Sequence, residues 1–258
     1  MQFINNQRFA QLAGVNFDSE KIQQGPIVYS RTHEVVRQFG KLKDFPECIL
    51  ITSFSDAQCT DEMADKLPLN IKKWYTNNVD TNNPRVEIIP IGLRTSSEGE
   101  DVLRKAINIG RLPNRNLMYM NFMRNIPRVY NPREGIYEQF LCKKWVTGEG
   151  GFEHVPMEQF YGQILSHPFT LSPPGAGPDC HRHWESIILG SIPVVLKSKT
   201  TEILNGLPCF QVNNWDEVTA TRLRMEYPRL KELFKSPRME ICYFEYWKEK
   251  IMKEAECI

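Results

Sequence analysis

Short apolar runs bounded by turn residues recur along the chain, and their spacing predicts strands that alternate with helices. Runs typical of strands lie in the first part of the chain, at 26–29, 48–52 and 86–90. The segments between them predict helical or turn structure, at 33–39 and 71–74. Strands that alternate with helices indicate parallel sheets, and therefore an α/β fold.

A second α/β half follows a hinge. Residues 77–84 (NNVDTNNP) predict a loop, 96–109 predict a helix, and 110–115 (GRLPNR) carry the glycine and proline of the expected hinge. The next strand is expected at Leu117, and the pattern continues to about Asn214.

These boundaries predict two domains, 1–112 and 113–238, each a Rossmann-like half. After them, residues 239–252 present a broad apolar face, which predicts a closing helix.

The most informative stretch is PFTLSPPGAGPDCHRHWESIILGSIPVVL, residues 168–196. An apolar run at 169–171 predicts a strand, and the prolines and glycines of 173–178 end it. Asp179 is a suitable N-cap for a helix that Gly190 can end, and 192–196 predicts the next strand.

The helix within this stretch carries the chemistry. A glycine-rich turn that leads into a helix N-terminus binds anions, because free N–H groups and the positive end of the helix dipole face the ligand. Arg182 and Glu185 lie three residues apart and share a face. The arginine suits a diphosphate and the carboxylate suits a ribose diol, whereas Trp184 is expected in the core. The stretch therefore predicts a nucleotide-sugar site.

Composition narrows the class of protein. Of the 258 residues, 41% are apolar and 24% are charged, which fits packed cores and excludes disorder. The net charge of +1 offers no field for nucleic acid or an anionic membrane, and no run of roughly 18 apolar residues could span a bilayer. The start of the chain lacks the pattern of a signal peptide, and the seven cysteines are scattered, which favours free thiols in a reducing compartment. We expect a soluble, cytoplasmic chain without a membrane anchor.

The stretch SPPGAGPDCHRHWESIILGSIPVV resembles the signature of the exostosin-like glycosyltransferases, roughly S-P-x-G-x-G-x-D-x-H-R-x-W-E-x-x-x-x-G-x-I-P. The matching residues are Gly175, Gly177, Asp179, His181, Arg182, Trp184, Glu185, Gly190, Ile192 and Pro193. Four further segments resemble this family, at 86–92 (VEIIPIG), 117–122 (LMYMNF), 131–133 (NPR) and 213–218 (NNWDEV).

The resemblance implies a GT-B architecture, in which two Rossmann-like domains face each other across a cleft. The second domain would bind the nucleotide, the first would contact the acceptor, and the final segment, 239–258, would return to the first domain as a helix. The implied reaction is inverting transfer from a UDP-sugar to a hydroxyl of an oligosaccharide or glycoprotein. The compact build resembles virus-encoded xylosyltransferases of this group, which favours UDP-xylose as the donor.

The sequence disfavours two other functions. A non-catalytic family member could bind sugars or stabilise a partner enzyme, but such a protein should have lost Arg182 or Glu185, and both are present. A dinucleotide-dependent enzyme is disfavoured because no G-x-G-x-x-G follows an early strand.

The resemblance also assigns the donor site. It gives Arg182 and Arg133 to the diphosphate and Glu185 to the ribose hydroxyls, and the remaining donor-site residues are Gly175, Gly177, Asp179 and His181.

No metal or other cofactor is expected. The segment 180–183 (CHRH) could suggest zinc, but no partner pair of cysteines lies near it. The chain contains no D-x-D pair of the kind that holds manganese in glycosyltransferases of the other major fold. Arginines and a helix dipole would then neutralise the leaving group.

The catalytic base should be a carboxylate or histidine at the carboxyl end of a strand of the first domain. Asp56 follows the run at 48–52, and His33 and Glu34 follow the run at 26–29. Asp18 is a weaker candidate. The sequence does not choose among them.

Overall fold

The computed structural model describes the 258-residue chain except for residues 18–20, 23–24, 95–96, 115, 125–132, 134 and 149–154, and the side chains of 21–22 and 97–98. Asp18, Asn131 and Pro132 therefore lie outside the described residues. The chain divides into two compact units: Met1–Gly92 with Gly177–Asp179 and Glu240–Ile258, and Leu93–Ala176 with Cys180–Met239. The division falls after Gly92, whereas the sequence analysis placed its boundary after residue 112.

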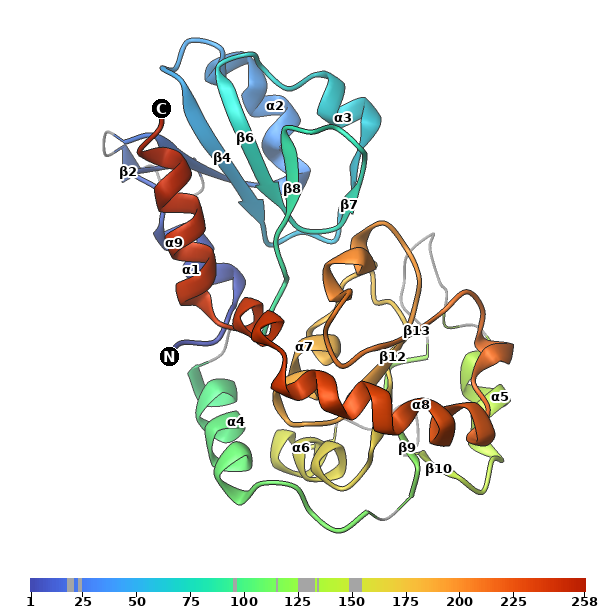
Figure 1. The fold of residues 1–258 in the computed structure, drawn as a ribbon. Coiled ribbons are helices and arrows are strands. Elements are labelled where there is room, and N and C mark those ends of the chain that lie inside the picture. Colours follow the sequence, from blue (N-terminus) through green and yellow to red (C-terminus); the bar gives the residue numbers. More distant parts are fainter. Residues whose placement is uncertain are drawn as a thin grey trace. The chain divides into compact units, whose positions relative to one another are not determined.

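The first unit is built on a sheet of strand order β2-β1-β3-β4-β6-β8, in which β1 and β2 are antiparallel and the other pairs are parallel. The strands are β1 (Val15–Asn16), β2 (Lys21–Ile22), β3 (Ile27–Arg31), β4 (Cys48–Ser53), β6 (Ile71–Thr76) and β8 (Val86–Ile88). Two short strands, β5 (Cys59–Thr60) and β7 (Val79–Asp80), pair separately. The helices are α1 (Asn6–Gln11), α2 (Thr32–Leu42), α3 (Asp61–Asp65) and α9 (Phe244–Ala255) (Figure 1).

Strand β6 corrects the sequence prediction of a helical or turn segment at 71–74. Ile71 and Trp74 are fully buried in the strand, and the ring of Trp74 packs edge-on against Phe39 of α2. Two lysines interrupt the apolar run, but Lys73 forms an ion pair of 3.2 Å with Glu87 of the neighbouring strand β8. Because cross-strand pairing and burial stabilise the extended segment, they outweigh its weak local pattern.

The closing helix of the chain belongs to the first unit. Residues 239–252 were expected to form one helix, but the structure has a 3₁₀ segment, Pro237–Cys242, followed by α9, which extends to Ala255. The ring of Phe9 in α1 contacts the rings of Phe244 and Trp247 in α9, at centroid distances of 5.7 and 6.3 Å. These apolar contacts explain why α9 lies against the beginning of the chain.

The second unit contains a fully parallel sheet of order β10-β9-β11-β12-β13. Its strands are β9 (Met118–Met120), β10 (Val146–Gly148), β11 (Phe169–Leu171), β12 (Ile192–Leu196) and β13 (Phe210–Val212). Its helices are α4 (Ser97–Ile109), α5 (Ile136–Leu141), α6 (Met157–Leu165), α7 (His181–Ile188) and α8 (Ala220–Glu232), with 3₁₀ turns at Thr200–Leu204, Trp215–Glu217 and Leu233–Lys235. Helix α4 packs against α6, so the helix expected at the end of the first half is part of the second unit.

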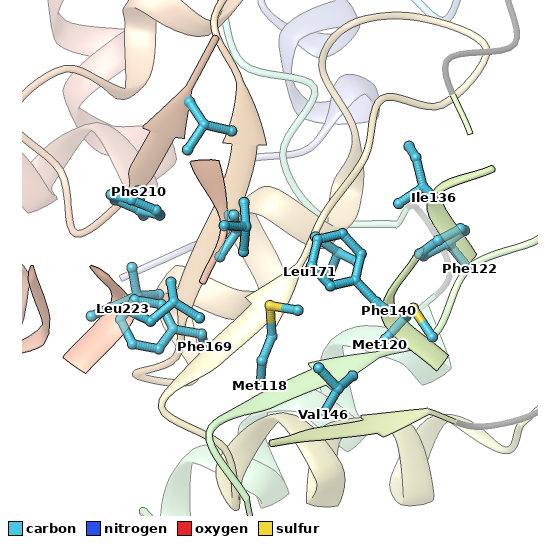
Figure 2. Packing of buried hydrophobic residues seen from close by; sticks show 14 of the residues in the cluster. Met118, Met120, Phe122, Ile136, Phe140, Val146, Phe169, Leu171, Phe210 and Leu223 are labelled. Atoms are coloured by element: carbon cyan, nitrogen blue, oxygen red, sulfur yellow. The ribbon is translucent and has the colours of Figure 1, made fainter. Parts of the chain in front are cut away.

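One apolar cluster of the second unit packs on one face of this sheet (Figure 2). Met118 pairs with Phe169, and Met120 pairs with Leu171, in adjacent parallel strands. All four side chains are fully buried. Because the register is parallel, β9 and β11 end at the same edge of the sheet, and the loops that follow them start side by side.

These sheets confirm the predicted α/β class with parallel strands. None of the helices in the described part of the chain has both the length and the apolar character that crossing a bilayer requires.

Candidate functional site

Helix α7 begins at His181, with Cys180 at the N-cap position. The sequence analysis had placed Asp179 at that position. The structure gives Asp179 another partner: its Oδ2 accepts a hydrogen bond of 2.8 Å from the backbone N–H of Ile91 in the first unit. The C-terminal prediction is confirmed, because Gly190 follows the helix with φ of +77°, a conformation that glycine adopts without strain.

Gly177 is required by packing within the first unit. A Cβ at this position would lie 2.6 Å from Nδ2 of Asn78, closer than van der Waals contact allows. The same side chain accepts a hydrogen bond of 3.1 Å from the N–H of Asp179 through its Oδ1. The structure therefore gives Gly177 and Asp179 packing roles, and their part in phosphate binding stays a prediction, as does that of Gly175.

A cavity of about 390 Å³ opens at the carboxyl edge of the second sheet. Its walls come from the residues after β9, from the start of α7 and from α6, and include Phe122, Phe160, Cys180 and His181. Arg94, Arg133 and Arg182 also line it. This position, beyond the carboxyl ends of parallel strands, is where α/β proteins bind ligands.

The two arginines assigned to the diphosphate are brought together in this cavity. Arg133 donates through Nε to the carbonyl of Pro174 at 2.7 Å and through Nη1 to that of Met123 at 2.9 Å. Burial and the neighbouring charge of Arg182 lower the pKa of Arg133 to about 10. Burial also lowers the pKa of Arg182, and its Nε has no hydrogen-bond partner among the described residues. A bound anion would accept a hydrogen bond from this Nε, and its negative charge would raise the pKa of both arginines.

Glu185, on the same helix as Arg182, is fully buried. Its Oε1 accepts from the hydroxyl of Tyr161 and lies near Nε of Arg94, each at 3.3 Å. Its Oε2 has no hydrogen-bond partner among the described residues. A buried acceptor without a partner is costly, and a ligand hydroxyl would satisfy it. Trp184, the neighbouring residue, is fully buried in the core, as expected.

Arg94 and Tyr161 are site residues that the sequence analysis missed. Arg94 follows the segment 86–92, and its guanidinium lies 5.5 Å from the ring centroid of Phe160. Tyr161 lies on α6, which carries no family-like motif. Their contact with Glu185 joins segments far apart in the sequence, so the only available signal was the position of Arg94, two residues after the Pro-x-Gly segment.

Cys180 adds a thiol to the cavity. Burial raises its pKa, but His183, Arg182 and the hydroxyl of Ser172 together lower the pKa of the Cys180 thiol to about 6. Its sulfur lies 4.0 Å from Nη1 of Arg182, close to where an anionic ligand would sit. The described residues contain no cluster of three or more His, Cys, Asp or Glu side chains suited to hold a metal ion.

The candidate bases lie at one edge of the sheet in the first unit. His33 and Glu34 stand in the first turn of α2, directly after β3, and their side chains approach to 3.5 Å. Asp56 lies three residues after β4, which is the parallel neighbour of β3. All three are partly or well exposed to solvent. The structure thus places the three candidates after neighbouring strands, and the choice among them stays open.

Comparison with known proteins gives a likeness at the level of fold. No protein-family model matches the chain, and no curated protein matches it. Sucrose-phosphate synthase from Thermosynechococcus elongatus is similar over 90% of this chain and 73% of its own, with 11% identity and a TM-score of 0.51. HepE from Anabaena, solved in complex with UDP-glucose, is similar over 90% of this chain and 79% of its own, with 10% identity and a TM-score of 0.52. At this identity the likeness shows a shared α/β fold of the GT-B kind.

Proposed function

We propose that this protein is a glycosyltransferase that moves a sugar from a UDP-sugar to a hydroxyl of a glycan acceptor. One observation carries the proposal, and it lies on helix α7. Arg182, a buried cation that lines the cavity, has a donor, Nε, without a partner among the described residues. Glu185, three residues further along the helix, is a buried carboxylate whose Oε2 likewise has no partner among them. A nucleoside diphosphate supplies both complements, since its phosphates accept hydrogen bonds and its ribose hydroxyls donate them.

The cavity also suits departure of the leaving group. Negative charge develops on the diphosphate as the glycosidic bond to it breaks. Arg133 and Arg182, which are buried and line the cavity at the start of α7, would stabilise that charge without reorganisation. The proposed reaction therefore needs no metal ion.

The acceptor chemistry is assigned to the first unit. A base there would deprotonate the acceptor hydroxyl, which attacks the anomeric carbon as the diphosphate leaves and so inverts the configuration. The resemblance of residues 172–195 to the exostosin-like signature supports this class of reaction, with an oligosaccharide or glycoprotein as acceptor and UDP-xylose as the preferred donor. The fold shared with HepE, a protein solved with UDP-glucose, supports a UDP-linked donor.

The test is a panel of UDP-sugars incubated with the protein in EDTA, with UDP release as the readout. We expect slow hydrolysis of the preferred donor, UDP-xylose, and its loss in Glu185→Ala and Arg182→Ala. Arg104→Ala, which breaks an exposed ion pair with Glu100 on α4, is the matched control and should keep wild-type release. UDP binding without hydrolysis or transfer would instead identify a non-catalytic sugar-binding or partner-stabilising protein, and failure to bind UDP would refute the assignment.

A further inference from the structure

The contacts of Glu185 are unequal between its two oxygens. Oε1 faces two donors, the hydroxyl of Tyr161 and Nε of Arg94, whereas Oε2 faces none among the described residues. The three residues come from three segments of the second unit: α6, α7 and the connection after Gly92. Such an arrangement fixes the orientation of the carboxylate and leaves Oε2 without a hydrogen-bond partner among the described residues.

We propose that Arg94 and Tyr161 are positioning residues, which hold Glu185 by Oε1 so that Oε2 is presented to the ribose hydroxyls of the donor. This inference rests on the proposed function, because it names how the donor site selects a ribonucleotide. Neither residue needs to touch the donor itself; each acts through the carboxylate.

The burial of Glu185 explains why two donors are needed. A carboxylate with no exposed surface loses its hydration, and hydrogen bonds from polar neighbours must replace it. Without these donors, the side chain could turn its oxygens toward other groups, and the ligand would have to reorder it on binding. Donors fixed in advance remove that cost from ligand binding.

Both donors are suited to the task. Burial, with the nearby charge of Glu185, raises the pKa of Tyr161 above its ordinary value, so its hydroxyl keeps its proton and stays a donor. The guanidinium of Arg94 is steadied by the ring of Phe160 at 5.5 Å. The side chain of Arg94 is 43% exposed, so solvent screens its charge and its main contribution is geometric.

The test compares ligands that differ only in the hydroxyls that Oε2 would accept. Binding of UDP, 2′-deoxy-UDP, 3′-deoxy-UDP and pyrophosphate is measured by calorimetry in EDTA for the wild type, Arg94→Gln, Arg94→Lys and Tyr161→Phe. Two control variants remove comparable groups elsewhere. Arg104→Gln changes an arginine whose side chain is about as exposed as that of Arg94, and Tyr29→Phe removes a buried hydroxyl that is hydrogen-bonded to Ser53 in the first unit.

We expect the wild type to prefer UDP over at least one deoxy analogue by about ten- to a hundredfold, the range for a hydrogen bond to a charged group. The variants Arg94→Gln and Tyr161→Phe should lose most of that preference. Their affinity for UDP should fall, whereas their affinity for pyrophosphate should stay unchanged. Arg94→Lys should restore part of it, and both control variants should behave like the wild type.

Three results would overturn the inference. Full ribose discrimination in both Arg94→Gln and Tyr161→Phe would show that neither residue positions Glu185. An equal loss of UDP and pyrophosphate affinity in Arg94→Gln would make Arg94 a phosphate ligand instead. Absence of UDP binding by the wild-type protein would remove the proposed function itself, and the inference with it. Thermal unfolding of each variant separates these outcomes from misfolding.

Discussion

Arg133 and Arg182 direct their guanidinium groups at the same ring, that of Phe122, at 5.5 and 5.8 Å from its centroid. Both side chains are more than nine-tenths buried. Two like charges this close repel each other unless an anion lies between or beside them. The aromatic ring offsets part of the repulsion through its negative face. The pair therefore indicates a site that is incomplete without an anionic ligand.

The first prediction concerns this pair of cations. Arg133→Ala and Arg182→Ala should each weaken UDP binding by about 1.5–3 kcal/mol, because each removes charge-assisted hydrogen bonds to the diphosphate. Calorimetry in EDTA measures the change. The affinity of the wild-type protein for UDP should also fall as the salt concentration is raised. Wild-type affinity in both variants, or loss of wild-type binding on chelation, would contradict the metal-free arginine site.

Part of this picture could be predicted from the sequence alone. The strands β4, β11 and β12 were predicted because short apolar runs ended at turn residues, and Arg182 and Glu185 were paired because helix spacing places them on one face. Both inferences depend only on residues that are close together in the sequence. The structure keeps these elements within a few residues of the predicted bounds.

The remaining features depend on contacts between distant segments. Tyr161 and Arg94 meet at Glu185 only after α6 and the connection after Gly92 have packed, and no local pattern records that meeting. Asp179 has the preferences of an N-cap, but a competing donor, the N–H of Ile91, determines where its carboxylate points. The capping propensity of Asp179 correctly indicates a carboxylate that accepts a hydrogen bond from a backbone N–H. The N–H that donates it, however, belongs to Ile91 and not to helix α7.

A second prediction tests the packing role of Gly177. Gly177→Ala places a Cβ against the side chain of Asn78, so we expect a loss of roughly 1–3 kcal/mol in unfolding free energy. Asn78 has φ of +52°, which glycine tolerates, so Asn78→Gly removes the obstacle without backbone strain. Adding Asn78→Gly to Gly177→Ala should therefore cost less than the sum of the two single changes. Urea unfolding of the four proteins measures this coupling, and additive costs would argue against the clash.

A third prediction follows from the thiol of Cys180. With a pKa of about 6, it is largely a thiolate at pH 7.5 and should react rapidly with iodoacetamide. Burial raises the pKa of Cys48 to about 11 and that of Cys59, which also lies near Asp61, to about 12, so both should stay unreacted. The exposed Cys142 and Cys257 are replaced by serine to isolate the signal. Saturating UDP should protect Cys180, and mass spectrometry of the labelled protein gives the measurement.

The same thiol sets a pH dependence for donor binding. A diphosphate bound beside Arg182 raises the pKa of Cys180 because the two negative charges repel, so binding takes up a proton once the thiol is ionised. Affinity for a UDP-sugar, whose diphosphate does not titrate in this range, should be highest below pH 6 and fall as pH rises through that value. Cys180→Ser should flatten the pH profile of donor binding, whereas the same profile in this variant and in the wild type would show that the thiol is not the titrating group.

The last prediction assigns the base to the edge of the sheet where β3 and β4 end. His33, Glu34 and Asp56 lie there, after neighbouring parallel strands, with enough exposure to meet an acceptor. Replacing the true base should reduce turnover by about 10²–10⁴ while UDP affinity stays near that of the wild type, because the base meets the acceptor rather than the nucleotide. Asp56→Asn keeps the shape of the side chain and is the first variant to make, followed by His33→Ala and Glu34→Gln. Near wild-type transfer by all three variants would place the base elsewhere in the chain, and a parallel loss of UDP binding would mark the altered residue as structural.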